Sequence, residues 1–375
     1  MELKVGIIGA RGLSTVLGFN TISGVKVEAL CDLNENLLQE QAAKYNIPKT
    51  FRIYEDMLNS DIDAVVVSTP MQLHVPQAIA ALEAGKHVLS EVTAGVTMDE
   101  LWWLIECVEK YNKVYMMAEN YCYIPEVQLI ENMVGQGLFG DVYFGEGEYL
   151  HDIKELTTYS DGKTSWRKFW QLGKRGCFYP THSLGPVMKW FKGDRVKSVS
   201  CMGTGWHTAP EFRQEDTSIT LCRMESGKLI KLRVDCISER PHNLTYYSLQ
   251  GTKGCYEAPR GMGDNHKIWF KGMDENTEKA YWRPLSDFSQ YLPERYKNAT
   301  EEQKAAGHWG GDYFIVQDFV DAVQKDIKPA IDVYEASEWT AVALLSELSA
   351  MNNGKIMEMP DFRKAKSFKD QVIKL

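Results

Sequence analysis

Short apolar runs alternate with helical patterns over the first third of the chain. The runs lie at residues 4–8, 25–30, 64–70 and 87–91, and the helical patterns between them include residues 34–45 and 75–84. Strands that are apolar on both faces are typical of parallel sheets, because crossover helices cover both sides of such sheets. The alternation therefore predicts an α/β domain, with a doubly wound parallel sheet over residues 1–121.

The pattern changes after Tyr121, where strand-like stretches follow one another with turn residues between them. These stretches lie at residues 141–150, 196–202, 217–224, 229–236, 244–250 and 253–256. They predict a mainly antiparallel sheet, so residues 122–375 are expected to form an α+β domain. Residues 275–307 are polar and aperiodic, which indicates an excursion or a loop. Residues 313–323 and 334–351 have helical spacing, and the second helix could return to pack on the first domain.

The stretch at residues 142–152 has an unusual distribution of small and aromatic residues. Side chains two apart share one face of a strand, which here carries Tyr143, Gly145, Gly147, Tyr149 and His151. Glycine weakens a strand and often marks a place where another backbone or a ligand comes close. We interpret the two glycines as room for a cofactor ring. The alternative is an ordinary curved strand with a buried tyrosine.

Length and composition narrow the class of protein. A chain of 375 residues is longer than one hydrophobic core usually accommodates, which indicates two domains. The net charge of -9, with no run of Lys or Arg, argues against a nucleic-acid surface and favours a small-molecule partner. The eight cysteines never form Cys-x-x-Cys, so we expect free thiols in a reducing compartment and no metal site. No signal-like start or membrane-length apolar stretch is present, which predicts a cytoplasmic protein without a membrane partner.

A glycine-rich turn directly after the first apolar run suits a dinucleotide. Gly9, Arg11 and Gly12 lie in this turn, where backbone amides can approach a pyrophosphate, although Arg11 and Ser14 replace the further glycines of the usual pattern. Asp32 ends the second strand about 20 residues later, where a carboxylate accepts hydrogen bonds from ribose hydroxyls. Because this carboxylate would repel a 2′-phosphate, NAD is favoured over NADP. The alternative role for Asp32 is a cap for the helix at residues 34–45.

Polar residues also gather at the ends of the later strands of this domain. The carboxyl ends of parallel strands meet at one edge of the sheet, where doubly wound folds bind their ligands. Six residues fall at or just past such ends, and we expect them to line the cofactor site: Thr69, Pro70, His74, Glu91, Glu119 and Asn120.

Several motifs resemble the glucose–fructose oxidoreductase and inositol dehydrogenase family. They are Gly9-Ala-Arg-Gly12, Thr69-Pro-x-x-x-His74, Ala84-Gly-Lys-His-Val88 and Glu91. The resemblance implies a Rossmann domain joined to an open-faced antiparallel sheet domain, and oxidation of a sugar hydroxyl with NAD(P). Ordinary members carry Glu-Lys-Pro where this chain has Glu91-Val92-Thr93, and an Asp and a His where it has Pro180 and Leu184. The usual proton-transfer residues are therefore absent.

The replacement motifs are similar to those of the NAD-dependent family-109 glycoside hydrolases, typified by alpha-N-acetylgalactosaminidase. They include Glu91-Val-Thr-Ala, Glu119-Asn-Tyr-Cys-Tyr123, Gly145-Glu-Gly-Glu-Tyr-Leu-His-Asp152, Tyr179-Pro-Thr-His182 and Gly307-His-Trp-Gly-Gly-Asp312. The resemblance implies hydrolysis through transient oxidation of the sugar at C3, removal of the C2 proton, elimination of the aglycone from C1, addition of water and re-reduction. Glycosidases of this kind need no pair of carboxylates at the glycosidic bond.

The resemblance also assigns expected roles to individual residues. His182 is the candidate base for the C3 hydroxyl, since a histidine titrates near neutral pH, and a helix-capping histidine is the alternative. Tyr149 is the candidate C2 base, and His151 polarises it or handles the leaving group, although these two roles could be exchanged. Tyr179 is expected to bind a substrate hydroxyl.

Four further residues carry weaker expectations. Glu119 binds NAD or orients a catalytic group, with a structural cap as the alternative. His308 and Asp312 lie in a glycine-rich turn that suits close approach of a sugar, and a simple loop is the alternative there. Tyr246 is a weaker candidate for a substrate contact, and packing is the favoured alternative.

Three functions remain open at this stage: a glycosidase that recycles NAD, an NAD-dependent sugar dehydrogenase, and a non-catalytic NAD-binding sensor. The sugar is also open, because Arg167, Lys168, Lys174 and Arg175 form either a solvated basic face or a site for an anionic sugar in place of N-acetylgalactosamine. The open-faced sheet of the resembling family implies a homo-oligomer, a dimer or tetramer, formed through strands of the second domain.

Overall fold

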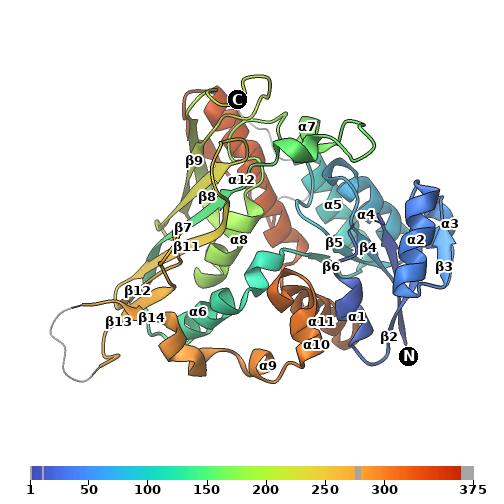
Figure 1. The fold of residues 1–375 in the computed structure, drawn as a ribbon, viewed down its shortest axis with the longest axis horizontal. Coiled ribbons are helices and arrows are strands. Elements are labelled where there is room, and N and C mark those ends of the chain that lie inside the picture. The colour runs from blue at the N-terminus through green and yellow to red at the C-terminus, as the bar shows by residue number, and fades with distance from the viewer. Residues whose placement is uncertain (1, 11, 275–279, 365–375) are drawn as a thin grey trace. The chain divides into compact units, whose positions relative to one another are not determined.

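The computed structural model describes residues 2–10, 12–274 and 280–364 of the chain. Two units, each with its own sheet, make up the chain (Figure 1). Unit 1 comprises Met1–Tyr123, Ala299–Ser337 and Pro360–Leu375, and unit 2 comprises Ile124–Asn298 and Glu338–Met359. The expected boundary at residue 121 lies beside the first break between the units, and two later segments return to unit 1.

Unit 1 contains a parallel sheet of six strands in the order β3-β2-β1-β4-β5-β6. The strands are β1 (Leu3–Ile8), β2 (Val25–Cys31), β3 (Lys49–Phe51), β4 (Ala64–Val67), β5 (His87–Ser90) and β6 (Tyr115–Met117). All four residues of β4 are buried, as its apolar run predicts. The doubly wound domain is therefore confirmed, and the strand order reverses between β1 and β4, which is where such folds bind ligands.

Helices α1 (Val16–Asn20), α2 (Glu35–Tyr45), α3 (Tyr54–Leu58), α4 (His74–Glu83) and α5 (Met98–Tyr111) connect these strands. Helix α5 begins at a capping box in which Thr97 and Glu100 satisfy each other's backbone amides.

The segment Ala299–Ser337 brings α10 (Glu301–Ala305), the short helix η5 (His308–Gly310) and α11 (Gly311–Lys325) back to unit 1. Helix α11 lies against α1, since a Cβ atom added to Gly18 would come 3.0 Å from the Asp312 carbonyl oxygen. Residues 285–297, where a loop was expected, form η4 (Leu285–Tyr291) and α9 (Glu294–Lys297), whereas residues 275–279 lie outside the described part of the chain.

Unit 2 contains a sheet in the order β14-β13-β12-β11-β7-β10-β9-β8-β15. Its strands are β7 (Val142–Leu150), β8 (Val196–Gly203), β9 (Ser218–Met224), β10 (Leu229–Asp235), β11 (Asn243–Gly251), β12 (Gly254–Glu257), β13 (Lys267–Phe270), β14 (Arg283–Pro284) and β15 (Met357–Glu358). Only the β7–β10 pair among these neighbours is parallel, so the mainly antiparallel sheet is confirmed. The sequence pattern did not predict the last three strands, which are two to four residues long.

The helices of unit 2 are α6 (Pro125–Gly135), η3 (Lys154–Thr157), α7 (Arg167–Trp170), α8 (Thr181–Trp190) and the larger part of α12 (Val333–Met351), which begins in unit 1. The short helix η2 (Asn120–Tyr123) precedes α6 and belongs to unit 1. No described helix is both long and apolar enough to cross a membrane.

The glycines of β7 do not make room for a cofactor ring, which corrects that expectation. A Cβ atom at Gly147 would lie 1.9 Å from the Ser183 carbonyl oxygen, and one at Gly145 would lie 2.5 Å from a methyl carbon of Val187. Both contacts belong to α8, whose first turn packs directly on the strand. The missing side chains therefore allow a helix backbone to approach, which is the other reason for glycine inside a strand.

Candidate functional site

The glycine turn after β1 packs against the end of β4. Gly9 has a φ of 106°, and a Cβ atom there would lie 2.5 Å from the Ser68 carbonyl oxygen. A Cβ atom at Gly12 would lie 2.4 Å from the Ser68 Cβ atom. Both positions therefore need glycine to keep the backbone of the turn close to the sheet. Arg11, which was also expected to bind the cofactor, lies outside the described residues.

Asp32 connects the end of β2 to this turn. Its Oδ2 accepts a hydrogen bond of 2.8 Å from the Ala10 amide, and its Oδ1 accepts one of 2.8 Å from the Asn34 amide. The cap of α2 is Asn34, whose side chain accepts from the Leu37 amide. Asn34, and not Asp32, therefore caps α2. The Asp32 carboxylate lies beside the glycine turn, which is the position of the carboxylate that binds the ribose hydroxyls in Rossmann domains.

His74 holds two loops together from the interior of unit 1. Its Nδ1 lies 2.7 Å from the Thr93 carbonyl oxygen, its Nε2 lies 2.8 Å from the Thr69 carbonyl oxygen, and only 2% of the residue is exposed. Burial lowers the pKa of this imidazole from its usual value. Because both nitrogens face backbone oxygens, His74 can position Thr69 for a ligand but has no ring nitrogen left for direct contact.

Carboxylates gather at the ends of β5 and β6. Glu91 follows β5, Glu119 follows β6 and is fully buried, and Asp312 enters from the first turn of α11. Both oxygens of Asp312 lie within 3.0 Å of the His308 Nδ1 atom. This hydrogen bond is the largest cause of the raised pKa of His308. The turn containing His308 therefore belongs to the ligand edge of the first sheet, which the sequence order does not reveal.

Asn120 adds a polar atom to the same edge. Its Oδ1 is buried and has no hydrogen-bond partner among the residues that the structure describes. A buried amide oxygen without a protein partner is costly unless a ligand, an ion or a water molecule satisfies it. Together with the close-packed glycine turn and the Asp32 carboxylate beside it, this observation fits a dinucleotide.

Glu91 is expected to make the stability of the cofactor-free protein depend on pH. Desolvation, and then the Asp312 carboxylate, raise its pKa from 4.5 to about 7. Because the folded-state pKa lies above the unfolded value, Glu91 costs no stability below pH 4.5. The cost develops as the pH rises from 4.5 to about 7 and is complete above that. After a discount for partial exposure, Glu91→Gln should recover about 2 kcal/mol in the free energy of unfolding at pH 8 relative to pH 5.

Urea unfolding at both pH values measures this difference. The exposed Glu40→Gln variant is the control, and a Glu91→Gln variant with the wild-type pH dependence would contradict the prediction.

Four predicted catalytic residues lie together in unit 2. Tyr149, at the end of β7, is 5.2 Å from His182 and 5.9 Å from Tyr179 between ring centroids, and Tyr179 and His182 are 5.1 Å apart. The Tyr149 hydroxyl and His151 Nδ1 form a hydrogen bond of 2.8 Å. His182 lies in the first turn of α8, which the glycines of β7 bring against the strand. The packing of α8 on β7 thus assembles this aromatic cluster, which consists of Tyr149, His151, Tyr179 and His182.

His151 remains neutral at physiological pH. Burial, and then the neighbouring His242 and Arg167, lower the pKa of its imidazole to about 4. The rings of His151 and His242 are 4.7 Å apart. A neutral imidazole can accept the hydrogen of the Tyr149 hydroxyl at Nδ1, which provides a route for removing that proton. The sequence analysis missed His242, because a single histidine before a strand carries no spacing signal.

Tyr246 does not join the aromatic cluster, which corrects its expected role as a contact in that site. It pairs with Glu148 across β11 and β7, so both side chains lie on the face opposite Tyr149. There the Arg260 guanidinium covers the Tyr246 ring at 3.6 Å and donates to Glu148. Its neighbour Tyr247 faces α8 instead, where its hydroxyl donates to the His182 carbonyl oxygen at 2.6 Å.

The basic stretch before Tyr179 is partly neutralised. Arg175 forms an ion pair of 3.1 Å with Glu215, and Lys174 lies 3.7 Å from Glu347. Arg167 instead donates to Gln171 at 2.7 Å and contributes to the lowered pKa of His151.

Comparison with known proteins identifies both parts of the chain. Residues 3–119 match the model of an oxidoreductase family with an NAD-binding Rossmann fold. Residues 123–369 match the C-terminal domain of glycosyl hydrolase 109. The chain belongs to glycosyl hydrolase family 109. Its first unit is accordingly an NAD-binding Rossmann domain, and the glycine turn, Asp32 and Asn120 fit that cofactor.

Curated relatives and solved structures agree with this family. A family 109 protein of Saccharopolyspora erythraea is 31% identical and covers 97% of this chain and 84% of its own length. One of Solibacter usitatus is also 31% identical, with coverages of 97% and 89%. A levoglucosan dehydrogenase in complex with NADH has a TM-score of 0.79 at 19% identity and covers 96% of this chain and 100% of its own. At that identity the likeness shows the fold alone.

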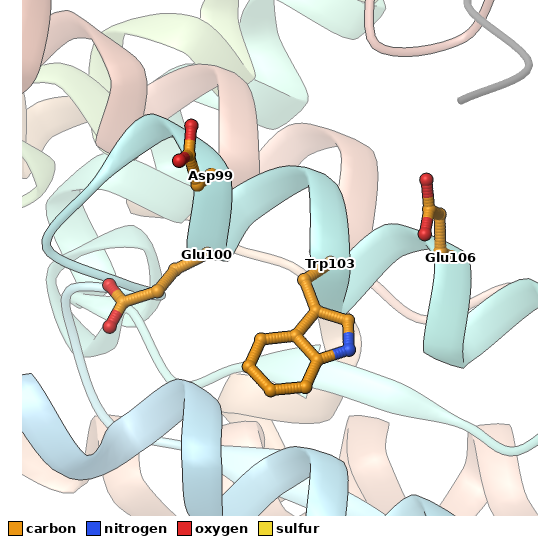
Figure 2. Close-up of a pocket in the computed structure, with 4 residues that line it drawn as sticks. All are labelled: Asp99, Glu100, Trp103 and Glu106. Carbon is orange, nitrogen blue, oxygen red and sulfur yellow. The ribbon is translucent and has the colours of Figure 1, made fainter. Parts of the chain in front are cut away.

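A hollow beside α5 is lined by none of the predicted site residues. It has a volume of about 440 Å³ and is lined by Asp99, Glu100, Trp103 and Glu106 of α5 (Figure 2). Glu100 is occupied there by the capping box. The candidate site residues lie instead at the strand ends of unit 1 and in the aromatic cluster of unit 2.

Proposed function

We propose that this chain is a glycosidase that uses NAD without net oxidation, with Tyr149, His151, Tyr179 and His182 as its catalytic and substrate-contacting groups. The observation that supports it most directly is the hydrogen bond between Tyr149 and His151 beside His182. Simple oxidation of a hydroxyl needs one base, whereas elimination needs a second one for the neighbouring carbon. The aromatic cluster offers both.

Each residue of the cluster has a distinct task in this proposal. The bound dinucleotide supplies reversible oxidation of the sugar at C3. His182 takes the proton of the C3 hydroxyl and later returns it. Tyr149 would remove the C2 proton as a phenolate, after its phenol proton has passed to the His151 Nδ1 atom and from there to solvent. Tyr179 binds a substrate hydroxyl and helps to exclude water from the site.

Unit 1 binds the dinucleotide in this proposal through Gly9, Arg11, Gly12, Asp32, Glu119 and Asn120. Thr69, His74 and Glu91 shape the edge on which it lies. His308 and Asp312 are proposed to contact the sugar. Because Lys174 and Arg175 are paired with carboxylates, a neutral sugar such as N-acetylgalactosamine is favoured over an anionic one.

Hydrolysis in D2O tests this function. Purified protein is incubated with p-nitrophenyl glycosides, and the carbon-bound deuterium of the released sugar is measured by mass spectrometry while absorbance at 340 nm is recorded. The elimination route places deuterium at C2 without accumulating NADH. Stoichiometric NADH with no deuterium at C2 would instead establish the sugar dehydrogenase, and neither signal would favour a binding protein.

The proposed assembly is a dimer or tetramer that uses the outer face of the sheet in unit 2. This face carries side chains of β7 and β10 that pair with one another, including Glu146 with Lys231, and beside them the exposed Met202 and Leu221. Exposed apolar side chains beside polar ones are typical of interfaces. Light scattering at micromolar concentration should give at least twice the monomer mass, and a monomer would refute the assembly.

A further inference from the structure

Trp309 has a backbone conformation that disfavours its own side chain. His308, Trp309 and Gly310 have consecutive φ values of 47°, 59° and 84°, all in the left-handed region. A bulky L-residue in this region costs about 1–2 kcal/mol relative to glycine. The side chain recovers little of this cost through burial, because Trp309 remains 58% exposed. Folding therefore favours glycine at position 309, and the tryptophan calls for another explanation.

The surroundings of Trp309 connect it to the ligand edge of unit 1. Its ring meets Tyr121 edge to face at 6.0 Å, and Tyr121 follows Asn120 at the end of β6. Its chain neighbour His308 is held at Nδ1 by the buried Asp312, so the other ring nitrogen of His308 is left for an external partner. An exposed indole and a fixed imidazole thus lie side by side in the chain, next to the carboxylates at the ends of β5 and β6.

We propose that Trp309 is the stacking platform for the pyranose ring of the substrate and determines which sugars are held beside His308. A pyranose has an apolar face of C–H groups and a rim of hydroxyls. An aromatic ring can cover the first while a neighbouring donor or acceptor binds the second. This inference rests on the proposed sugar substrate but does not depend on the elimination mechanism.

The chain provides a matched control for an exposed tryptophan. Trp103 is 54% exposed on α5, in the same unit, and lines the hollow of Figure 2. It lies in a regular helix, where no left-handed backbone has to be explained. Trp103→Ala therefore removes a comparable exposed surface without touching the ligand edge.

The test compares Trp309→Gly, Trp309→Phe and Trp103→Ala with the wild type. Sugar binding is measured by titration calorimetry with methyl α-pyranosides of glucose, galactose and N-acetylgalactosamine, and NAD content is measured after acid extraction. We expect Trp309→Gly to raise the dissociation constant of the best sugar at least tenfold, with an unchanged or higher Tm and unchanged NAD content. Trp309→Phe should retain most of the affinity, and Trp103→Ala should retain all of it.

The contrary outcomes are distinct. The inference is overturned if Trp309→Gly binds the sugars as the wild type does, if it lowers NAD content in place of sugar affinity, or if the wild type binds none of the pyranosides. A wild type that incorporates deuterium at C2, combined with a Trp309→Gly variant of normal affinity, would remove the platform and leave the proposed function intact. If the wild type releases no nitrophenol but Trp309→Gly still loses sugar binding, the platform would stand and the proposed glycosidase function would fail.

Discussion

Tyr149→Phe is expected to lower kcat for glycoside hydrolysis by about 10²- to 10⁴-fold, the usual contribution of a positioned acid–base group. The phenol is the group proposed to remove the C2 proton, and the variant keeps the ring that packs against Tyr179 and His182. The variant loses the hydrogen bond with His151, and a hydrogen bond of this kind contributes about 1 kcal/mol to stability. The protein should therefore remain folded and retain NAD.

Two variants make this result specific. Tyr143→Phe changes a 45%-exposed tyrosine on the same strand and should leave kcat unchanged. His182→Ala should abolish reduction of bound NAD on addition of substrate, whereas Tyr149→Phe should leave that reduction and stop deuterium exchange at C2. Single-turnover absorbance at 340 nm and mass spectrometry of the sugar separate the two steps. Unchanged exchange in Tyr149→Phe would exclude this residue as the base.

Gly147→Ala should disrupt the aromatic cluster by displacing α8. The added Cβ atom would lie 1.9 Å from the Ser183 carbonyl oxygen, a backbone atom that can move only with the helix. Overpacking of this kind costs about 1–3 kcal/mol and occasionally more. Because the contact is with a backbone atom, we expect a loss at the upper end of this range, about 3 kcal/mol in the free energy of unfolding. We also expect a large loss of activity, because His182 lies in the displaced turn.

Gly261→Ala is the matched control for this substitution. An added Cβ atom at Gly261 meets no heavy atom within 4 Å, so urea unfolding and activity should stay at wild-type values. A Gly147→Ala protein that unfolds at the wild-type urea concentration and remains fully active would show that α8 is not held by contact with β7.

The strands that the sequence predicted are those with strong local patterns. The apolar run that became β4 and the alternating stretches that became β7 to β12 lie within a few residues of their expected bounds. Strands β3, β6, β13, β14 and β15 were missed because pieces of two to four residues are too short to show a period. Their existence depends on pairing with a neighbour that is already in place.

The residues of the candidate site also fall into those that local spacing revealed and those that it did not. The glycine turn and Asp32 were recognisable, because their spacing along the chain corresponds to one turn and one crossover of a Rossmann unit. The sequence did not reveal that His308 and Asp312 lie close to the carboxylates after β5 and β6, since about 200 residues separate these segments. His242 was missed because a single histidine carries no spacing signal, and it reaches His151 through the pairing of β11 with β7.

The sequence by itself determined the two kinds of sheet, the cofactor class and the residue types available for proton transfer, because these depend on local periodicity and on motifs of adjacent residues. Only the tertiary structure decided which face each residue occupies. The register between β11 and β7 sends Tyr246 away from Tyr149, and the glycines of β7 receive a helix where a cofactor was expected. Register and packing result from contacts between segments far apart in the chain, and the order of residues alone does not specify those contacts.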